Sequence, residues 1–187
     1  MDGHTLRREI AESMREIVFG LEDAFVSTLG AVTGIAAGAQ NTEIVILSGF
    51  VIVSVEALSM AAGSYLSNKS ANEAEDAVLS ESGEKRSGLN APLFRSAVVM
   101  GVFYLLGGMV PLAPYFFLPI TRAYAPSIVL TALCLFALGA WASSFSKKRS
   151  AWKGGWHMVV ISLSAAALGF AIGRAVNAFY GGTLVGL

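Results

Sequence analysis

Residues 44–66 have the sequence IVILSGFVIVSVEALSMAAGSYL, with no Lys or Arg and a single acid, Glu56. An α-helix rises about 1.5 Å per residue, so a bilayer core needs about 20 successive apolar residues. Strands of a membrane barrel need only about 10 residues and alternate in polarity. This stretch is longer and uniformly apolar, and it therefore predicts a transmembrane helix.

Stretches of the same kind lie on both sides of it. We predict an all-α integral membrane protein in which five transmembrane helices form a single domain over residues 1–187. Residues 67–94 are expected to form a cytosolic connector, which begins as a continuation of the second helix. The five predicted spans are Ile17–Ala39, Ile44–Leu66, Arg95–Leu118, Tyr124–Phe145 and His157–Tyr180.

Composition supports the membrane class and excludes others. Of the 187 residues, 55% are hydrophobic and 14% charged, against about 25% charged in soluble domains, and the mean hydropathy is +0.63. Thirteen basic residues balance thirteen acids, so no net charge points to nucleic acid. The single cysteine excludes a disulfide framework. Enzyme motifs such as HExxH and GxSxG are absent, so we expect no catalytic residues.

The polar N-terminus predicts a surface helix. The first sixteen residues are too polar for a cleaved signal peptide, so we expect nothing to be removed. Leu6, Ile10, Met14 and Ile17 recur at helical spacing among charged residues. This pattern predicts a short amphipathic helix lying on the membrane surface. The alternative is a polar leader with no such role.

The distribution of basic residues predicts the orientation. Cytosolic loops of membrane proteins carry an excess of Lys and Arg. Given five spans, eleven of the thirteen basic residues fall on one side, with Arg122 on the other side and Arg174 inside the last span. We therefore expect a cytosolic N-terminus. The eleven residues are Arg7, Arg8, Arg15, Lys69, Lys85, Arg86, Arg95, Lys147, Lys148, Arg149 and Lys153.

Three acids fall inside predicted spans: Glu22 and Asp23 early in the first, and Glu56 near the middle of the second. An ionisable side chain inside the hydrocarbon costs about 2.5–3.5 kcal/mol even on the lenient insertion scale. Neither of these two spans contains a Lys or Arg that could neutralise them. A structural role would normally bring a basic partner, whereas a transport pathway leaves the acids for a cation or a proton.

Depth arithmetic pairs these acids across two antiparallel helices. Asp23 and Met60 each lie six residues from the cytosolic end of their span, about 9 Å deep. One turn further in, Ser27 and Glu56 share a level. Carboxylates alone suit Mg²⁺ or Ca²⁺, but an added thioether favours a softer metal such as Fe²⁺. The alternative for Met60 is a helix-packing residue, a common role for Met.

Small residues on the first span predict a close helix contact. Gly30, Gly34 and Gly38 form two successive GxxxG units, and such units let another helix approach closely. Since one chain has few polar ligands, a symmetric homodimer would double them. We expect Gly30 and Gly34 to lie at or beside the two-fold interface.

Two motifs resemble those of a known family. Residues 15–30, REIVFGLEDAFVSTLG, resemble the first-helix signature VFGLNDGLVSTLG of the vacuolar iron transporter family. Residues 57–67, ALSMAAGSYLS, resemble its second-helix motif SMAxGEYVS. Residues 107–115, GGMVPLAPY, and 172–174, IGR, fit its third and fifth helices. The likeness runs in order over most of the chain.

The resemblance implies a five-helix dimer that moves Fe²⁺, and often Mn²⁺, out of the cytosol in exchange for protons. It implies no permanently bound cofactor, because the metal is the cargo. It places the transport site at Asp23 and Met60, the pair that the depth argument also selects. A prokaryotic plasma membrane, or a vacuolar-type membrane in a eukaryote, is the expected location.

This chain also departs from the family pattern. Glu22 and Ala24 replace the Asn and Gly that flank the motif Asp, and Ser64 replaces the Glu of GEY. Glu56 adds an acid where a small residue is common. Many members carry a Glu-rich cytosolic three-helix domain between the second and third helices, and residues 67–90 are too short for it. We therefore expect a minimal form that takes metal directly from the cytosol.

The leading hypothesis is a proton-coupled exporter of divalent iron or manganese. Asp23 is expected to be the essential ligand and, with Glu56, to couple transport to protons, while Met60 tunes selectivity. Glu22, nearer the cytosol, is expected to be an entry ligand or a charge attractor. Glu56 is the better proton carrier, because desolvation favours the neutral form of a carboxyl group, and it remains a candidate ligand beside Asp23. Two alternatives stay open: a proton-coupled exporter of organic cations and a membrane scaffold that transports nothing.

Overall fold

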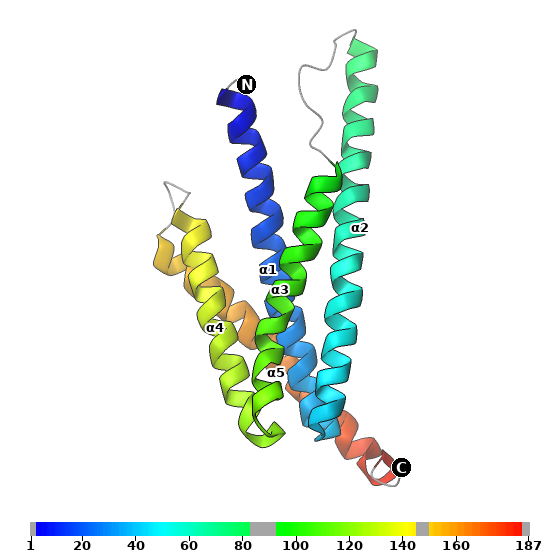
Figure 1. Ribbon diagram of the computed structural model, residues 1–187, viewed down its shortest axis with the longest axis vertical. Coiled ribbons are helices and arrows are strands. Elements are labelled where there is room, and N and C mark those ends of the chain that lie inside the picture. The colour runs from blue at the N-terminus through cyan, green and yellow to red at the C-terminus, as the bar shows by residue number, and fades with distance from the viewer. Residues whose placement is uncertain (1–2, 83–92, 145–149, 185–187) are drawn as a thin grey trace.

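The computed structural model describes residues 3–82, 93–144 and 150–184, and these form five long helices (Figure 1). No strand occurs in this part of the chain. Each helix contains a window long and apolar enough to cross a membrane. The predicted all-α fold with five membrane-spanning helices is therefore confirmed. The helices are α1 Gly3–Ala39, α2 Thr42–Ser82, α3 Leu93–Phe117, α4 Ile120–Ser144 and α5 Ala151–Leu184.

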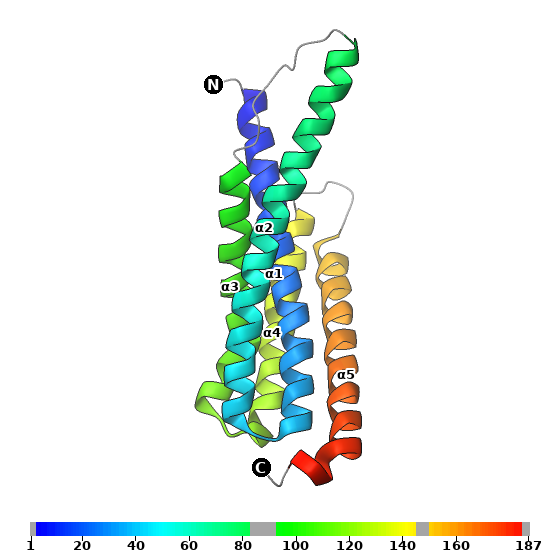
Figure 2. The ribbon, with the colours of Figure 1, turned by 90° about the vertical axis from the view of Figure 1, so that its right-hand side faces the viewer.

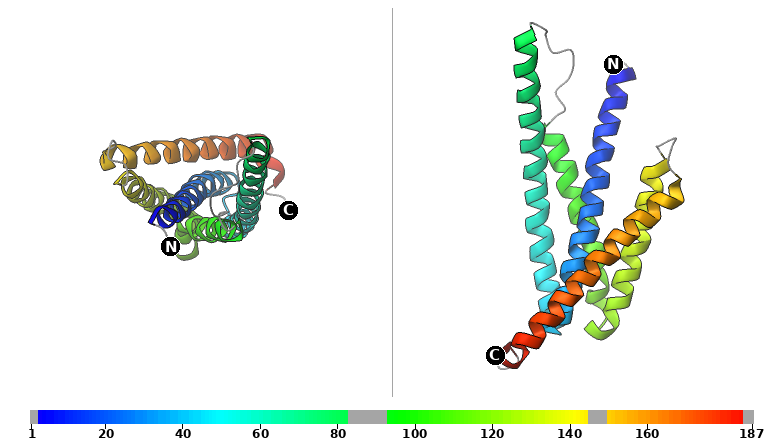
Figure 3. Two further views of the ribbon diagram at one scale, coloured as in Figure 1. Left: turned by 90° about the horizontal axis from the view of Figure 1, so that it is seen from above. Right: turned by 180° about the vertical axis from the view of Figure 1, so that it is seen from behind.

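Helix α1 lies at the centre of the bundle. It contacts each of the other four helices, and seen from above they surround it (Figure 3). Around it, α2 packs along α3 and α4 packs along α5 (Figure 2). Ala24, Leu29, Val32 and Ala36 of α1 have no exposed surface. This central position places the polar residues of α1 among other helices.

A short capped turn joins α1 to α2. Gln40 adopts a left-handed backbone with φ of 50°, which lets the chain reverse just after α1. The side-chain oxygen of Asn41 then accepts hydrogen bonds from the backbone N–H groups of Glu43, at 2.8 Å, and Ile44, at 3.2 Å. Such a cap satisfies donors that the first turn of a helix leaves free. The turn makes α1 and α2 antiparallel neighbours, as the depth argument requires.

The N-terminal segment differs from the prediction. Residues 3–16 continue α1 without a break and do not form a separate surface helix (Figure 1). No Gly or Pro separates them from the first span, so the helix can propagate through this boundary. Polar partners on neighbouring helices stabilise it: Arg95 donates a hydrogen bond to Ser13, at 3.0 Å, and Arg15 donates one to Asn68, at 3.3 Å.

Helix α2 extends well beyond its predicted span. It continues from Leu66 to Ser82, so the first part of the connector is helical, as the sequence suggested. Exposed Lys69 and Glu73 form an ion pair of 3.8 Å on this extension. The remainder of the connector, residues 83–92, lies outside the described residues.

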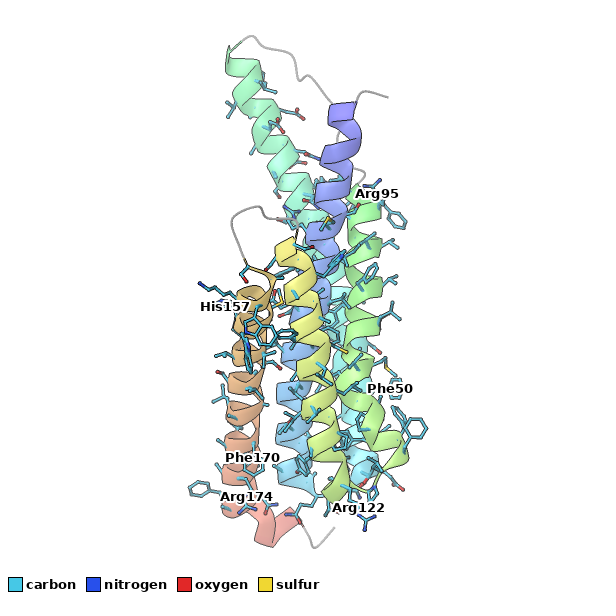
Figure 4. The ribbon with its side chains drawn as sticks, turned by 90° about the vertical axis from the view of Figure 1, so that its left-hand side faces the viewer. Phe50, Arg95, Arg122, His157, Phe170 and Arg174 are labelled. Carbon is cyan, nitrogen blue, oxygen red and sulfur yellow. The ribbon has the colours of Figure 1, made fainter. Side chains whose placement is uncertain are left out.

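The surface and the two ends of the bundle suit a membrane. Large apolar side chains face outward along α2, where Leu58 is 73% exposed and Leu47 67% exposed, as lipid contact requires. Arg95 lies near one end of the bundle, and Arg122 and Arg174 lie near the other (Figure 4). We call these the Arg95 end and the Arg174 end. That the Arg95 end faces the cytosol stays a prediction.

Candidate metal centre

Three polar side chains from three helices meet inside the bundle. Ser27 of α1 donates a hydrogen bond to the Glu56 carboxylate of α2, with 3.1 Å between the oxygens. The Tyr104 hydroxyl of α3 also donates to Glu56. Ser27 and Tyr104 lie 2.6 Å apart, within hydrogen-bond distance of each other. We call these residues the polar triad, and they confirm the pairing of Ser27 with Glu56 that helix depth predicted.

Tyr104 is the member of the triad that sequence reasoning missed. Its side chain has no exposed surface, and it lies in the middle of α3 on the side facing α1 and α2. Its signal was a hydroxyl group inside an apolar span, because such a group needs a hydrogen-bond partner. The sequence does not reveal which helix supplies that partner.

Asp23 and Met60 lie one helical turn from the triad, on α1 and α2. Asp23 is half-buried and close enough to Glu56 for the two carboxyl groups to interact electrostatically. Met60 is half-buried and packs against a cluster formed by Ala24, Ala57 and Tyr104. The structure thus gathers both predicted ligands around the α1–α2 contact, while their direct pairing stays a prediction.

Glu22 faces a different neighbour. The half-buried Glu22 side chain interacts electrostatically with His157 of α5 as well as with Asp23. His157 lies on the half of α5 toward the Arg95 end (Figure 4). Glu22 and Asp23 therefore point to different sides of α1, because consecutive residues of a helix are rotated by about 100° about its axis. The role of Glu22 as a first ligand stays a prediction.

Glu16 is a second polar residue that sequence reasoning did not select. Only 2% of it is exposed, yet it lies near the charged Arg95 end. Its carboxylate pairs with Arg15 at 2.8 Å and accepts a hydrogen bond from Ser64 of α2 at 3.2 Å. This hydrogen bond joins α1 and α2 near the Arg95 end.

The described part of one chain offers an incomplete ligand set for a divalent cation. No three His, Cys, Asp or Glu side chains in this part cluster closely enough to hold a metal ion. The available donors are the Asp23 and Glu56 carboxylates and the Met60 thioether. Since hard divalent cations take six or more ligands, a passing ion has to keep water or find donors on a second chain.

An open groove of about 850 Å³ runs between α1 and α5, with Asp23 and Ser27 among its lining residues. The two helices approach closely along it. A Cβ atom added at Gly34 would lie 2.7 Å from the Gly169 carbonyl oxygen, and a Cβ atom at Gly169 would overlap the carbonyl of Gly30. Gly30 and Gly34 thus admit α5 of the same chain, and their place at a dimer interface stays a prediction.

Comparison with known proteins gives one family and several full-length relatives. The model of the VIT family matches residues 14–91 and 81–174. Vacuolar iron transporter 1 of Eucalyptus grandis is 24% identical over 218 residues, which covers 89% of this chain and 87% of the relative. Vacuolar iron transporter homolog 3 of Arabidopsis thaliana is 29% identical over 162 residues, covering 81% and 80%.

An archaeal relative has the same extent. A protein of Methanocaldococcus jannaschii, MJ0645, is 29% identical over 171 residues, which covers 86% of this chain and 88% of the relative. The matches therefore span nearly the whole of each protein and include all five helices.

Proposed function

Because the chain belongs to the VIT family, we propose that it exports divalent iron, manganese or both from the cytosol in exchange for protons. Iron as a cargo is supported by the names of the relatives from Eucalyptus grandis and Arabidopsis thaliana. Proton exchange and manganese transport go beyond what these names support. They rest on the chemistry of the acids inside the bundle.

The observation that carries the proposal is a pair of acids without a cationic partner. Asp23 and Glu56 lie within membrane-spanning helices, and no Lys or Arg among the described residues forms an ion pair with either. Each costs about 2.5–3.5 kcal/mol to place in the membrane. A transported cation or proton neutralises these acids, so transport explains why the chain carries them inside the membrane despite the energetic cost.

Asp23 is the proposed metal ligand. It lies beside the α1–α5 groove, and its carboxylate must lose its proton before it binds metal. Met60 adds a soft sulfur donor on α2, which favours Fe²⁺ over Mg²⁺ or Ca²⁺. A neutral thioether adds little Coulombic attraction, so Met60 tunes selectivity and Asp23 provides affinity.

Glu56 is the proposed proton carrier. Its carboxylate already accepts hydrogen bonds from Tyr104 and Ser27, which makes it less available to a metal than Asp23. The same two hydroxyl oxygens can accept a hydrogen bond once Glu56 is protonated. Both protonation states therefore have partners inside the bundle, as a residue that cycles between them needs. The electrostatic interaction between Glu56 and Asp23 couples proton binding to metal binding.

Direction, assembly and location complete the proposal. With the Arg95 end in the cytosol, an incoming metal meets Glu22 before it reaches Asp23 and Glu56. A homodimer supplies the donors that one chain lacks. Export across a prokaryotic plasma membrane, or into a vacuole in a eukaryote, matches this orientation.

One observation favours a second candidate, an exporter of lipophilic organic cations. The α1–α5 groove is lined mostly by apolar residues and has an acid, Asp23, near one end, and such a groove fits a bulky cation. Flux into proteoliposomes under an imposed pH gradient separates the two functions. Fe²⁺ uptake without uptake of tetraphenylphosphonium supports metal export. The reverse result supports the second candidate, and flux of neither cation would leave the chain as a scaffold.

A further inference from the structure

A second cleft lies on the opposite side of the α1–α5 contact. It has a volume of about 680 Å³ and is formed by α1, α4 and α5, toward the Arg174 end. The groove described above lies on the α2 side of the same contact and includes Asp23, whereas this cleft lies on the α4 side and contains no acid. We call it the α4 cleft. Among the residues that line it are Thr33, Tyr124, Ile128, Leu163, Phe170 and Arg174.

The mouth of the α4 cleft carries an unpaired positive charge. Arg174 is exposed, and no Asp or Glu among the described residues forms an ion pair with it. Across the cleft, Tyr124 of α4 interacts electrostatically with it. Arg174 and Phe170 lie near the same end of α5 (Figure 4), level with the end of α1, where Gly38 lies against Gly173. An anion at this depth would find an Arg with its donors available.

The interior of the α4 cleft is apolar. Ile128 of α4 faces Leu163 and Phe170 of α5 across it. Thr33 of α1 also lines the cleft and is 2% exposed, and its hydroxyl has no hydrogen-bond partner. The cleft is therefore a long apolar slot with a cationic mouth, and its size lies in the range of small-molecule sites.

Two contacts hold the walls of the cleft in place. The Asn177 side chain of α5 donates a hydrogen bond to the Gly38 carbonyl of α1 at 2.6 Å. About two turns away, Gly169 packs against the backbone of α1 so closely that a Cβ atom would overlap it. The cleft does not have to be opened by its ligand, so little binding energy is lost to reorganisation.

We propose that the α4 cleft binds one anionic phospholipid, with the phosphate on Arg174 and an acyl chain between α4 and α5. A phosphate is the bidentate partner that a guanidinium group prefers. The apolar interior excludes a free inorganic anion as the natural occupant, since such an anion would leave it empty. A metal ion is excluded because Arg174 would repel it.

The test measures how lipid changes the thermal unfolding midpoint of the full chain in detergent. Dioleoylphosphatidylglycerol, dioleoylphosphatidylcholine and inorganic phosphate are titrated separately. The matched variants are Arg174→Gln and Arg122→Gln, since Arg122 lies at the same end of the bundle and does not line the cleft. Only dioleoylphosphatidylglycerol should raise the unfolding midpoint of the wild type and of Arg122→Gln. Arg174→Gln should bind it about fivefold more weakly, which corresponds to about 1 kcal/mol for an exposed ion pair.

A variant that fills the α4 cleft with a larger side chain provides a second test, in which Arg174 is unchanged. Ala167 is exposed and lines the cleft, so Ala167→Phe should fold and block the acyl chain. Loss of stabilisation by dioleoylphosphatidylglycerol in this variant supports the proposal, even where Arg174→Gln is poorly folded. Equal stabilisation by the choline lipid or by phosphate alone, or full stabilisation of Ala167→Phe, overturns it. The outcome does not depend on whether the protein transports metal.

Discussion

Removing one hydroxyl group from the polar triad tests the proton site directly. Tyr104→Phe deletes the donor to Glu56 and keeps the buried ring that packs against Ala24 and Ala57. Glu56 then keeps only the Ser27 hydroxyl as a donor in this network. Because Glu56 loses one of the two hydroxyl groups that serve both of its protonation states, the pH dependence of metal transport should shift in the variant.

The size of the effect follows from the strength of the lost bond. A hydrogen bond to a charged group contributes about 1.5–3 kcal/mol, and 1.36 kcal/mol corresponds to about one pH unit. The midpoint of the pH dependence of metal transport should therefore move by up to about one to two units. The assay measures the initial rate of Fe²⁺ uptake into proteoliposomes at a series of internal and external pH values.

Tyr115→Phe is the matched control on the same helix. Tyr115 is as buried as Tyr104, with 1% of its surface exposed, but its hydroxyl has no hydrogen-bond partner. The control should keep the pH dependence of the wild type. If Tyr104→Phe and Tyr115→Phe have the same midpoint as the wild type, Tyr104 does not position the proton carrier and the reasoning fails.

Three further predictions concern the ligand set and the glycine contacts. Met60→Leu should retain part of the Fe²⁺ flux and lose discrimination against Mg²⁺, as measured by competition; unchanged discrimination would make Met60 a packing residue. Gly169→Ala should lower the thermal unfolding midpoint because its Cβ overlaps the Gly30 carbonyl. Gly63→Ala, with no atom near its Cβ position, should leave the midpoint unchanged or stabilise by about 0.5–1 kcal/mol. Gly34→Leu should reduce the dimer population in detergent cross-linking more than Gly169→Ala does, which disturbs the same α1–α5 packing within one chain; an unchanged population, or an equal loss in both variants, would count against a dimer interface there.

The helices could be predicted because lipid imposes a simple rule on sequence. Residues 44–66 have no basic residue and one acid, and the structure makes them part of α2. The same rule, applied as helical rise per residue, predicted that Ser27 and Glu56 share a depth, and they form a hydrogen bond. Depth along a helix depends only on counting residues from the membrane boundary.

The contacts between neighbouring helices could not be predicted in this way. Nothing in the sequence states that α3 brings Tyr104 to Glu56, because the position of α3 around α1 depends on packing across several helices. The glycines of α1 indicated a close helix contact, but not that Gly169 of α5 in the same chain makes it. The N-terminal helix was predicted, but its unbroken continuation into α1 was not, since the stabilising contact of Arg95 with Ser13 joins residues far apart in sequence.

The most direct test of the central claim compares Fe²⁺ uptake by three proteins under one imposed pH gradient. In proteoliposomes, the wild type should take up Fe²⁺ only when the gradient is present. Asp23→Asn should abolish uptake because it removes the essential ligand, and Glu56→Gln should allow uptake that no longer depends on the gradient. If Glu56→Gln kept full pH dependence while Asp23→Asn removed only that dependence, the roles of the two carboxylates would be reversed. Wild-type uptake by both variants would contradict the account.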